Sequence, residues 1–368
     1  MYNSAKELKG GRRAALLALA GLYLASLSLF TAEASRPARA GRAPAAAAAP
    51  PKANGKIAFT SGRDTDRLDI YVMNPDGTGL ARLTDGRSYN SDAAWSPDGR
   101  TLAFVSNRGG GSFAIYLMSA DGTNVRRLTA SAEDEGTPAW SPDGTKLAFA
   151  RGLAGCVPEA ACPGPDLYVI NADGTGETKL TSGRVGDSSP SWSPDGSKIA
   201  FEDGNGDIAV VNADGTGRVT IVSNAAWDWQ PRWSPDGSKI VFTSDRAGSS
   251  QLFIMNPDGT AQTQLTSSVN FNSYPTWSPN GRRIAFISYR NNDYEIYSIS
   301  PDGTQEKRLT TSAGFDYEPR WSSDGAKIAF YRYNTTNGEV WTMNADGTAQ
   351  TNVSNNAAND YGPTWQPR

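Results

Sequence analysis

The sequence predicts an all-β protein, a seven-bladed β-propeller, from one repeated pattern. A Trp followed by a turn recurs seven times at intervals of 41 to 52 residues, at Trp95, Trp140, Trp192, Trp233, Trp277, Trp321 and Trp365. Between successive Trp residues the chain always carries an apolar triad of the Ile-Ala-Phe type and then an Asp-Gly-Thr turn. A fixed period in the forties is typical of stacked four-stranded units, each too small to bury its own apolar face. The repeated Trp residues are therefore expected in the core, packed between blades.

Each repeat is expected to form four antiparallel strands, and the second repeat illustrates the pattern. A Ser-Pro-Asp-Gly sequence, which favours a type I turn, separates the first two strands, and an Asp-Gly-Thr turn separates the last two. Aromatic and aliphatic residues dominate between these turns, as β-strands prefer. The expected strands are Ala93–Trp95, Thr101–Val105, Phe113–Met118 and Val125–Leu128.

The blade number and the ring closure follow from counting each element by itself. The triads begin at Ile57, Leu102, Leu147, Ile199, Ile240, Ile284 and Ile328, and the Asp-Gly-Thr turns begin at Asp76, Asp121, Asp173, Asp214, Asp258, Asp302 and Asp346. The first repeat lacks a Trp strand, whereas the chain ends with an unpaired one, Gly362–Trp365. We expect this C-terminal strand to complete blade 1, which closes the ring and removes its open edges.

The first 54 residues lack the repeat, so the propeller is expected to span residues 55–368. Residues 1–34 have the anatomy of a signal peptide: basic residues, an apolar stretch from Ala14 to about Phe30, and the small-x-small site Ala32-Glu33-Ala34. Residues 35–54, rich in Ala and Pro, are typical of a linker. A periplasmic or secreted protein is predicted, with no direct membrane insertion after cleavage. The alternative is an uncleaved N-terminal segment that anchors the chain in a membrane.

Cys156 and Cys162 are the only cysteines, and both lie in the one enlarged interval of the repeat. The segment Gly152–Pro165 is an insertion between the second and third strands of its blade. Two cysteines close together in a loop of an exported chain predict a disulfide. A zinc site would need more ligands than these two.

The charge of the propeller limits its partners. The chain carries a net charge of −3, and residues 1–54 carry +6, which leaves about −9 on residues 55–368. A negative field repels nucleic acid and anionic lipid, so no nucleic-acid partner is expected. The charge suits a basic protein surface, a cation or a neutral glycan.

The absence of histidine excludes several classes of enzyme chemistry. Ser-His-Asp and Cys-His catalysis and histidine metal sites all need an imidazole, and the chain has none. No Gly-x-Ser-x-Gly nucleophile elbow is present either. We therefore predict a protein that is not an enzyme and needs no cofactor, with calcium left open as a ligand. Catalysis by a pair of carboxylates, as in glycosidases, is the surviving alternative.

The repeat resembles that of the TolB-type, WD-like propellers. The resemblance rests on Trp-Ser-Pro-Asp-Gly, on Glu295-Ile296-Tyr297 and on Met-Asn-x-Asp-Gly-Thr, and it covers residues 55–368. It implies the propeller fold and a binding role in the cell envelope. TolB itself has an N-terminal α/β domain and six blades, which this sequence does not predict. Similar propellers accompany prolyl-oligopeptidase-like domains, absent here, and form oligogalacturonate lyases, whose metal site is built on histidine.

The candidate site lies on the face opposite the short repetitive turns, where longer and more variable loops are expected. One polar residue stands five positions before each repeated Trp, and these seven could surround one mouth of the central channel. We call them the ring residues: Asn90, Glu135, Asp187, Asp228, Asn272, Asp316 and Asp360. Repetition in every blade favours an architectural role in binding loop backbone N–H groups. The functional alternative is a cation site or a docking surface for Lys and Arg.

Aromatic residues near the ring are less repetitive and add a second set of candidates. Trp227 and Trp229 flank Asp228, and Tyr317 and Tyr361 stand in comparable positions of other blades. Exposed Trp and Tyr beside carboxylates suit a protein hot spot or a stacked sugar, although packing within the loops explains Trp227 and Trp229 equally well.

Two functions follow from these residues. The first is an exported, non-catalytic propeller that binds an envelope or extracellular protein, or a neutral glycan, through this mouth. The second is a carbohydrate-binding or carbohydrate-cleaving propeller that uses Asp228 with Asp187 or Asp316. Because a catalytic pair should be an exception within the repeat, whereas these acids recur in most blades, the sequence favours binding.

Overall fold

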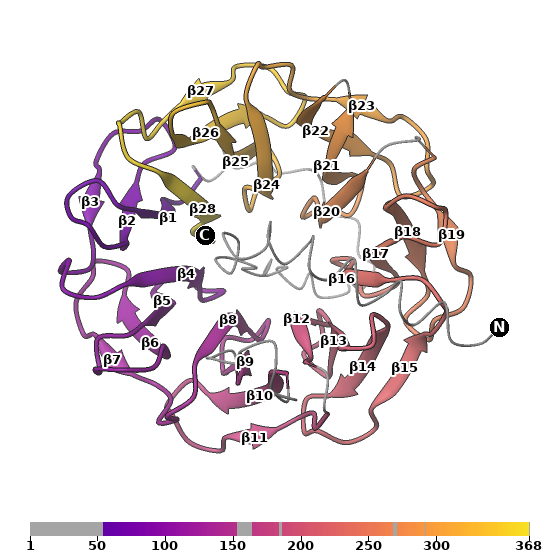
Figure 1. Cartoon of the computed structure of the whole chain (residues 1–368), viewed down its shortest axis with the longest axis horizontal. Coiled ribbons are helices and arrows are strands. Elements are labelled where there is room, and N and C mark those ends of the chain that lie inside the picture. Colours follow the sequence, from indigo (N-terminus) through magenta and orange to yellow (C-terminus); the bar gives the residue numbers. More distant parts are fainter. Residues whose placement is uncertain (1–53, 153–163, 184–185, 268–270, 291, 368) are drawn as a thin grey trace, which may run out of the picture.

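A computed structural model of the chain describes residues 54–152, 164–183, 186–267, 271–290 and 292–367. These residues contain no helix, and their 28 strands form seven four-stranded antiparallel sheets. Figure 1 shows the sheets as blades arranged around a central opening. The predicted fold class and the predicted number of blades are confirmed.

Each blade runs from an innermost strand to a short outermost one. Blade 1 comprises β28 (Asp360–Trp365), β1 (Ile57–Ser61), β2 (Asp69–Met73) and β3 (Ala81–Arg82); blade 2 comprises β4 (Asn90–Trp95), β5 (Thr101–Ser106), β6 (Ala114–Ser119) and β7 (Arg126–Arg127); blade 3 comprises β8 (Glu135–Trp140), β9 (Lys146–Arg151), β10 (Asp166–Asn171) and β11 (Thr178–Lys179). Blade 4 comprises β12 (Ser188–Trp192), β13 (Lys198–Glu202), β14 (Ile208–Asn212) and β15 (Val219–Val222); blade 5 comprises β16 (Asp228–Trp233), β17 (Ile240–Ser244), β18 (Gln251–Met255) and β19 (Thr263–Gln264). Blade 6 comprises β20 (Asn272–Trp277), β21 (Ile284–Arg290), β22 (Asp293–Ile299) and β23 (Lys307–Arg308); blade 7 comprises β24 (Phe315–Trp321), β25 (Lys327–Tyr333), β26 (Gly338–Asn344) and β27 (Thr351–Asn352).

The two ends of the propeller meet in blade 1, as expected. The C-terminal strand β28 pairs antiparallel with the N-terminal strand β1, with Trp365 opposite Ile57 and Asp360 opposite Ser61. In Figure 1, β28 fills the innermost place of the blade that β1, β2 and β3 begin. Closing the ring in this way pairs an edge of β1 that would otherwise be open to other chains.

Every innermost strand contains a β-bulge, and the two whose bounds were predicted, those of blades 1 and 2, begin earlier than expected. In blade 2, β4 starts at Asn90 rather than at Ala93, and its pairing with β5 shifts between Ser91 and Ala94. The residue three positions before each repeated Trp has a positive φ: Asp92, Thr137, Ser189, Gln230, Tyr274, Glu318 and Gly362. In six blades the next residue is Pro, which has no N–H to give to the ladder. Because polar residues and Pro dominate this first half of the strand, it lacks the apolar pattern from which strands are predicted.

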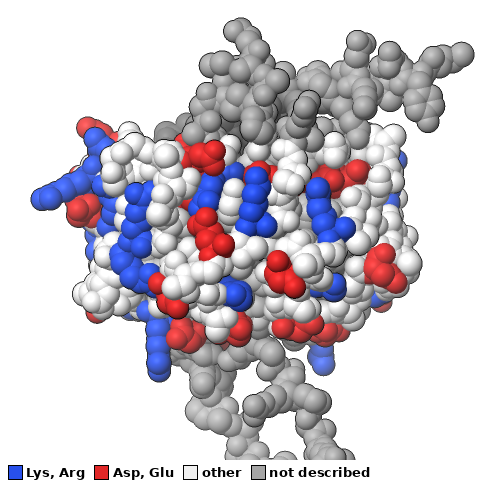
Figure 2. Space-filling view, turned by 90° about the horizontal axis from the view of Figure 1, so that it is seen from below, with Lys and Arg blue, Asp and Glu red and all other residues white. Residues whose placement is uncertain are grey.

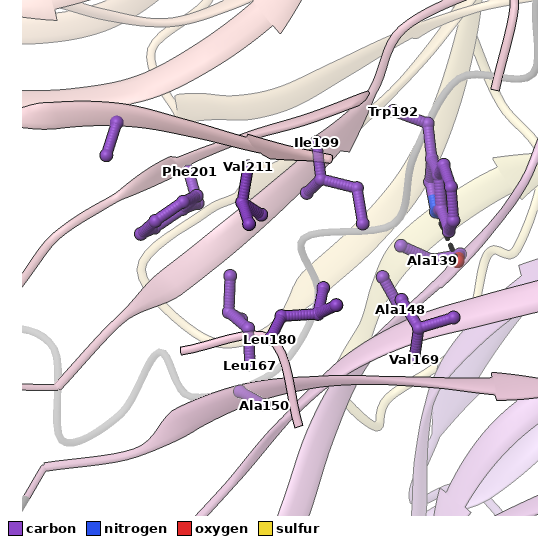
Figure 3. Close-up of a cluster of buried hydrophobic side chains, with 11 residues drawn as sticks. Ala139, Ala148, Ala150, Leu167, Val169, Leu180, Trp192, Ile199, Phe201 and Val211 are labelled. Atoms are coloured by element: carbon purple, nitrogen blue, oxygen red, sulfur yellow. Dashed lines mark hydrogen bonds between the residues drawn. The ribbon is translucent and has the colours of Figure 1, made fainter. Parts of the chain in front are cut away.

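The hydrophobic core lies between the blades rather than within them. Seven clusters of buried apolar residues are found in the described part of the chain, one at each blade interface. Figure 3 shows the interface of blades 3 and 4, where Leu167 and Leu180 face Ile199 and Phe201. This confirms that no repeat can bury its own apolar face.

The repeated Trp residues join neighbouring blades. Five indole N–H groups donate to a backbone carbonyl of the preceding blade; in one of them the Nε1 of Trp192 lies 3.0 Å from the oxygen of Ala139 (Figure 3). Trp95 and Trp233 have no indole acceptor among the described residues. Six of the seven Trp side chains are buried as predicted, but Trp233 is half-buried.

Several predictions concern residues outside the described part of the chain. The signal peptide, almost all of the linker, and the disulfide between Cys156 and Cys162 fall on residues 1–53 and 153–163. Within the described ranges, no helix is long and apolar enough to span a bilayer.

Figure 2 shows Lys and Arg interspersed with Asp and Glu over one flank of the disc, so this flank has no single-sign patch.

Candidate functional site

The ring residues lie at the start of the innermost strands, but their side chains are buried. Six of them are the first or second residue of such a strand, and Asp187 directly precedes β12. Their exposed fractions are 0 or 1%. They are therefore not presented to solvent as a ring of open carboxylates and amides.

Each ring residue is bound by an arginine of its own blade. The closest nitrogen–oxygen distances are 2.6 Å for Arg63–Asp360 and Arg332–Asp316, 2.8 Å for Arg151–Glu135 and Arg246–Asp228, 2.9 Å for Arg108–Asn90, 3.4 Å for Arg290–Asn272 and 3.6 Å for Arg218–Asp187. Charge-assisted contacts of this kind are stronger than neutral hydrogen bonds and stabilise buried carboxylates.

The same seven arginines stack on aromatic rings of the second and third strands. In blade 7, the Cζ of Arg332 lies 5.2 Å from the centroid of Phe330 and 4.3 Å from that of Trp341. Each other blade has at least one such contact, at 4.2 to 5.4 Å. We call the ring residue, its arginine and the stacked aromatic residue the blade latch. It ties the innermost strand of a blade to the strands outside it.

Sequence reasoning identified the acids of the latch but missed the arginines. Four of the arginines stand in a Ser-x-Arg sequence, as at Ser106-Asn107-Arg108; three of them lie two residues after the end of the second strand, and the fourth, Arg290, ends it. Arg151 and Arg332 lie within that strand or end it. The repeated Ser-x-Arg was the signal that could have predicted the pairing.

Blade 4 departs from this pattern. Counted from the apolar triad, Asp203 and Asn205 occupy the two positions that hold arginine in the other blades, and Arg218 reaches in instead from the turn before β15. Its Nη2 lies 3.6 Å from both Asp187 and Asp203, so two carboxylates share one cation. Burial, together with the charge of Asp203, raises the pKa of Asp187.

The electrostatics of the ring favour an architectural role. Burial raises the pKa of Glu135, Asp316 and Asp360, while the arginines and neighbouring hydroxyls act in the opposite direction. A carboxylate that is both buried and bound by arginine has little capacity left for a partner or for proton transfer. The ring residues thus tie the innermost strand of each blade to the other strands of that blade.

The four aromatic candidates lie in two different settings. Trp227 packs against the β13–β14 turn of blade 4: Gly206 has a φ of 81°, and a Cβ there would lie 2.9 Å from the indole. Trp229, Tyr317 and Tyr361 follow ring residues on three innermost strands and are half-buried. Burial raises the pKa of Tyr317 and of Tyr361.

Tyr317 belongs to an aromatic cluster that joins blades 6 and 7 at the loop side of the disc. Tyr294 is its centre, with ring centroids 4.7 Å from Tyr289, 5.0 Å from Tyr317 and 5.8 Å from Phe315. Phe271 and Tyr331 complete the set of six rings. Phe315 is 39% exposed, and Tyr333, paired with it across β24 and β25, is 37% exposed.

The aromatic cluster is an exception within the repeat, unlike the ring. Its strands β21, β22, β24, β25 and β26 have seven residues, whereas the other innermost, second and third strands have five or six. The strands of blades 6 and 7 therefore extend further at the loop side of the disc, and the aromatic cluster covers this extension. Phe315 and the neighbouring Tyr333 leave an exposed aromatic edge, and exposed aromatic residues next to one another are typical of binding surfaces.

Comparison with known families identifies the fold. Residues 25–161 and 201–368 match the TolB beta propeller domain. The chain belongs to this family. Comparison with curated proteins gave no match.

Solved structures with a similar propeller fold include proteins of different kinds. TolB from Acinetobacter baumannii is 20% identical, with a TM-score of 0.57 over 85% of this chain and 82% of that one. An oligogalacturonate lyase in complex with manganese is 16% identical, with a TM-score of 0.63 over 82% of this chain and 86% of that one. A puromycin hydrolase is 15% identical, with a TM-score of 0.67 over 82% of this chain but only 52% of that one. At these identities the likeness shows the fold alone.

The residues of this TolB-type propeller do not fit a histidine-based metal site. The chain has no histidine, and within the described ranges no three Cys, Asp or Glu side chains are grouped as a metal would require. Asp203 and Asp207 share one turn, but Asp203 accepts the backbone N–H groups of Asn205 and Asp207 at 3.0 and 3.1 Å. That geometry is an ordinary Asx turn.

Proposed function

We propose that this TolB-type propeller is exported and acts as a non-catalytic scaffold that binds a protein of the cell envelope or exterior. The proposed contact surface is the aromatic cluster of blades 6 and 7, with Phe315 and Tyr333 at its exposed edge. The observation that carries the proposal is that this cluster interrupts an otherwise regular repeat. A regular latch stabilises the fold, whereas a feature confined to two blades needs another reason.

The chemistry of the cluster suits a protein partner. Tyr and Phe offer large rigid surfaces with few rotatable bonds, and such residues dominate binding hot spots. The rings already contact one another, so little conformational entropy is lost on binding. The surface is therefore preorganised for binding.

The latch geometry supports a binding role over a catalytic one. The carboxylate-pair alternative relied on Asp228 with Asp187 or Asp316. Asp228 is bound by Arg246 at 2.8 Å and Asp316 by Arg332 at 2.6 Å, and all three acids are buried. A glycosidase needs one carboxylic acid and one carboxylate facing the sugar. Acids that are buried within blades and bound by arginine suit neither role, and this supports binding over catalysis.

Export is proposed from the N-terminal sequence and from the family. The basic and apolar segments of residues 1–34 have the order of a signal peptide. Membership of the TolB propeller family is consistent with a periplasmic or secreted location. Mass spectrometry of the protein from an expressing culture tests this. A mature chain that begins near Ser35, in place of the full-length chain, is the expected result.

The binding proposal is tested with the purified chain and two matched variants. Phe315→Ser/Tyr333→Ser removes the exposed edge of the cluster, and Tyr89→Ser removes an aromatic residue of similar exposure, 41%, from another blade. Crosslinking against an envelope extract should enrich one protein with the wild type and with Tyr89→Ser but not with the double variant. Binding of that protein, once purified, should follow the same order.

Two outcomes would contradict the proposal. Equal enrichment by all three forms would show that the cluster is not the contact surface. Retention of a polysaccharide in place of a protein would favour the neutral-glycan alternative, and its shortening would favour a glycan-cleaving enzyme. Circular dichroism of the double variant excludes loss by unfolding.

A further inference from the structure

A second exception to the repeat lies in blade 2, on the face of the disc that carries the Ser-Pro-Asp-Gly turns. The residue before each apolar triad is a cation in six blades and a threonine in blade 2. These residues are Lys56, Thr101, Lys146, Lys198, Lys239, Arg283 and Lys327. Blade 2 therefore lacks a cation that every other repeat carries.

This cation binds the end of the third strand of its own blade. The Nζ atoms of four of the lysines lie 2.6 to 3.2 Å from the Oδ1 of an asparagine there, as in Lys146–Asn171 at 2.6 Å. In blade 6 the cation is Arg283, which donates to the hydroxyl of Ser300 at 3.1 Å and to the main-chain carbonyl of Gln305 at 2.9 Å. Arg283 also lines the groove between blades 6 and 7.

The corresponding groove between blades 2 and 3 has no such cation in it. The volume of this groove is about 290 Å³, whereas one water needs about 10–15 Å³ on this measure. Thr101, Ser119 and Asn124 line its blade 2 side. They correspond in the repeat to Arg283, Ser300 and Gln305 of blade 6. The groove thus has room for a side chain of the size of arginine.

Blade 2 resembles blade 6 in all but the cation. Both have serine at the end of the third strand, where the other five blades have asparagine. Both also have an amide side chain, Asn124 or Gln305, where the others have Gly or Ala. The groove of blades 6 and 7 is the larger of the two, at about 510 Å³, so volume does not set the groove of blade 2 apart. The missing guanidinium does.

The charges around the groove of blades 2 and 3 favour a cation. Asp98 of blade 2 and Asp143 of blade 3 line it, and Arg126 is the one cation among its described lining residues. Arg126 already donates to the carbonyl of Ala172. The Oδ1 of Asp98 accepts the hydroxyl of Ser96 at 2.6 Å, whereas its Oδ2 has no hydrogen bond in the described part of the chain. An acceptor with a full negative charge is therefore available to a ligand.

We propose that the groove between blades 2 and 3 binds a guanidinium group on an alkyl stem, an arginine-like ligand, in the place that Arg283 occupies in blade 6. The guanidinium donates to the hydroxyl of Ser119 and to the carboxylate of Asp98, and the stem packs against Leu117. The planar fork of a guanidinium can reach both acceptors at once, which a single ammonium does less well. The ligand is a free arginine derivative or an arginine side chain of a protein, since both present this group.

The groove and the aromatic cluster lie on opposite faces of the disc. The groove is formed at the Ser-Pro-Asp-Gly turns, whereas the cluster is at the loop side. The proposal thus goes beyond the proposed docking surface and does not depend on it.

The proposal is tested by calorimetric titration and thermal unfolding of the purified chain. The probes are agmatine and a capped Gly-Gly-Arg-Gly-Gly peptide, and the controls are the same peptide with citrulline or lysine in place of arginine, all at equal ionic strength. The guanidinium probes should bind saturably and raise Tm. The citrulline peptide, which has nearly the same shape without the charge, should bind at least tenfold more weakly than the arginine peptide. The lysine peptide should lie between them.

The two guanidinium probes also distinguish the sources of the ligand. Tighter binding of agmatine would identify a small molecule, and tighter binding of the peptide would identify an arginine side chain of a protein.

Three variants assign the binding to the groove. Thr101→Arg supplies the missing guanidinium from the chain itself and should weaken binding at least tenfold. Asp98→Asn should weaken it at least threefold, and its turn should persist because blade 6 has Asn280 there, which accepts the serine hydroxyl at 2.8 Å. Ser238→Arg is the matched control, because it adds the same charge at an exposed turn position of blade 5, where blade 6 has Arg282. It should bind like the wild type.

Other results would overturn the proposal. No saturable binding of either guanidinium probe to the wild type would do so, as would an affinity for the citrulline peptide within twofold of that for the arginine peptide. Undiminished binding by Thr101→Arg, or an equal loss in Ser238→Arg, would show that the ligand binds elsewhere or responds only to net charge. Circular dichroism of each variant excludes unfolding as the cause.

Discussion

Arg332 holds Asp316 with two hydrogen bonds, from Nε to Oδ1 at 2.6 Å and from Nη2 to Oδ2 at 2.8 Å, while its guanidinium stacks on Trp341. This pair joins β24, β25 and β26 of blade 7. The same three-part latch recurs in the other blades with different residues. The latches thus supply polar connections within the blades, in addition to the apolar clusters that lie between them.

Asp316→Ala should destabilise the protein by about 3–5 kcal/mol, because it leaves Arg332 buried without its carboxylate. Asp316→Asn should cost less, since blade 6 already pairs an amide, Asn272, with Arg290. Urea unfolding measures both values. Equal losses for the two variants would contradict this expectation. They would show that the charge of Asp316 stabilises the latch and that a neutral hydrogen-bond acceptor at the same place does not.

Trp140→Phe should cost about 1 kcal/mol more than Trp95→Phe. Both side chains are 3% exposed, but only Trp140 has an indole acceptor, the carbonyl of Ala94 at 3.0 Å. The substitution at Trp95 removes a buried N–H that has no partner, which offsets part of the lost burial. Thermal unfolding of the two variants gives the difference, and a larger loss at Trp95 would contradict this account.

Thr137→Gly should leave stability unchanged or raise it slightly, whereas Gly362→Thr should lower it by about 1–2 kcal/mol. The two residues occupy the same bulge position in blades 3 and 1, with φ values of 53° and 64°. A β-branched residue is strained at such an angle, and the hydroxyl of Thr137 also lacks a partner. The pair of variants tests one backbone requirement from both directions, by urea unfolding.

Thr123→Val should raise the pKa of Asp121 toward its ordinary value of about 3.9. The hydroxyl of Thr123, bonded to Asp121 Oδ1 at 2.6 Å, lowers that pKa, followed by the backbone N–H of Thr123. A lowered pKa means stability that is present above the unfolded-state pKa and is lost as the pH falls through the folded-state value. The variant should therefore be less stable than the wild type at neutral pH, and this difference in stability should disappear in strong acid.

The measurement is an NMR titration of the Asp121 carboxyl carbon. Asp302, which has the same turn and an unaltered Thr304, serves as the internal control. An unchanged pKa of Asp121 in the variant would show that the backbone N–H of residue 123, and not the hydroxyl, lowers it.

The repeat by itself determined the fold of this protein. The spacing of seven Trp residues, seven apolar triads and seven Asp-Gly-Thr turns fixes four strands per blade, seven blades and the closure by Trp365, because each of these is a local pattern repeated in order. Even the outer strand of blade 2 was located, although β7 shortens to Arg126–Arg127 where Val125–Leu128 was expected.

Only the tertiary structure decided what the polar residues do. The sequence places Asp316 and Arg332 16 positions apart and cannot say whether that carboxylate faces solvent or a buried guanidinium. Folding brings them together across β24 and β25, and burial then makes the pairing obligatory. The same applies to Tyr294 and Tyr317, which lie on strands of two neighbouring blades. Their contact arises from the packing of blade 6 against blade 7, a relationship that no single repeat contains.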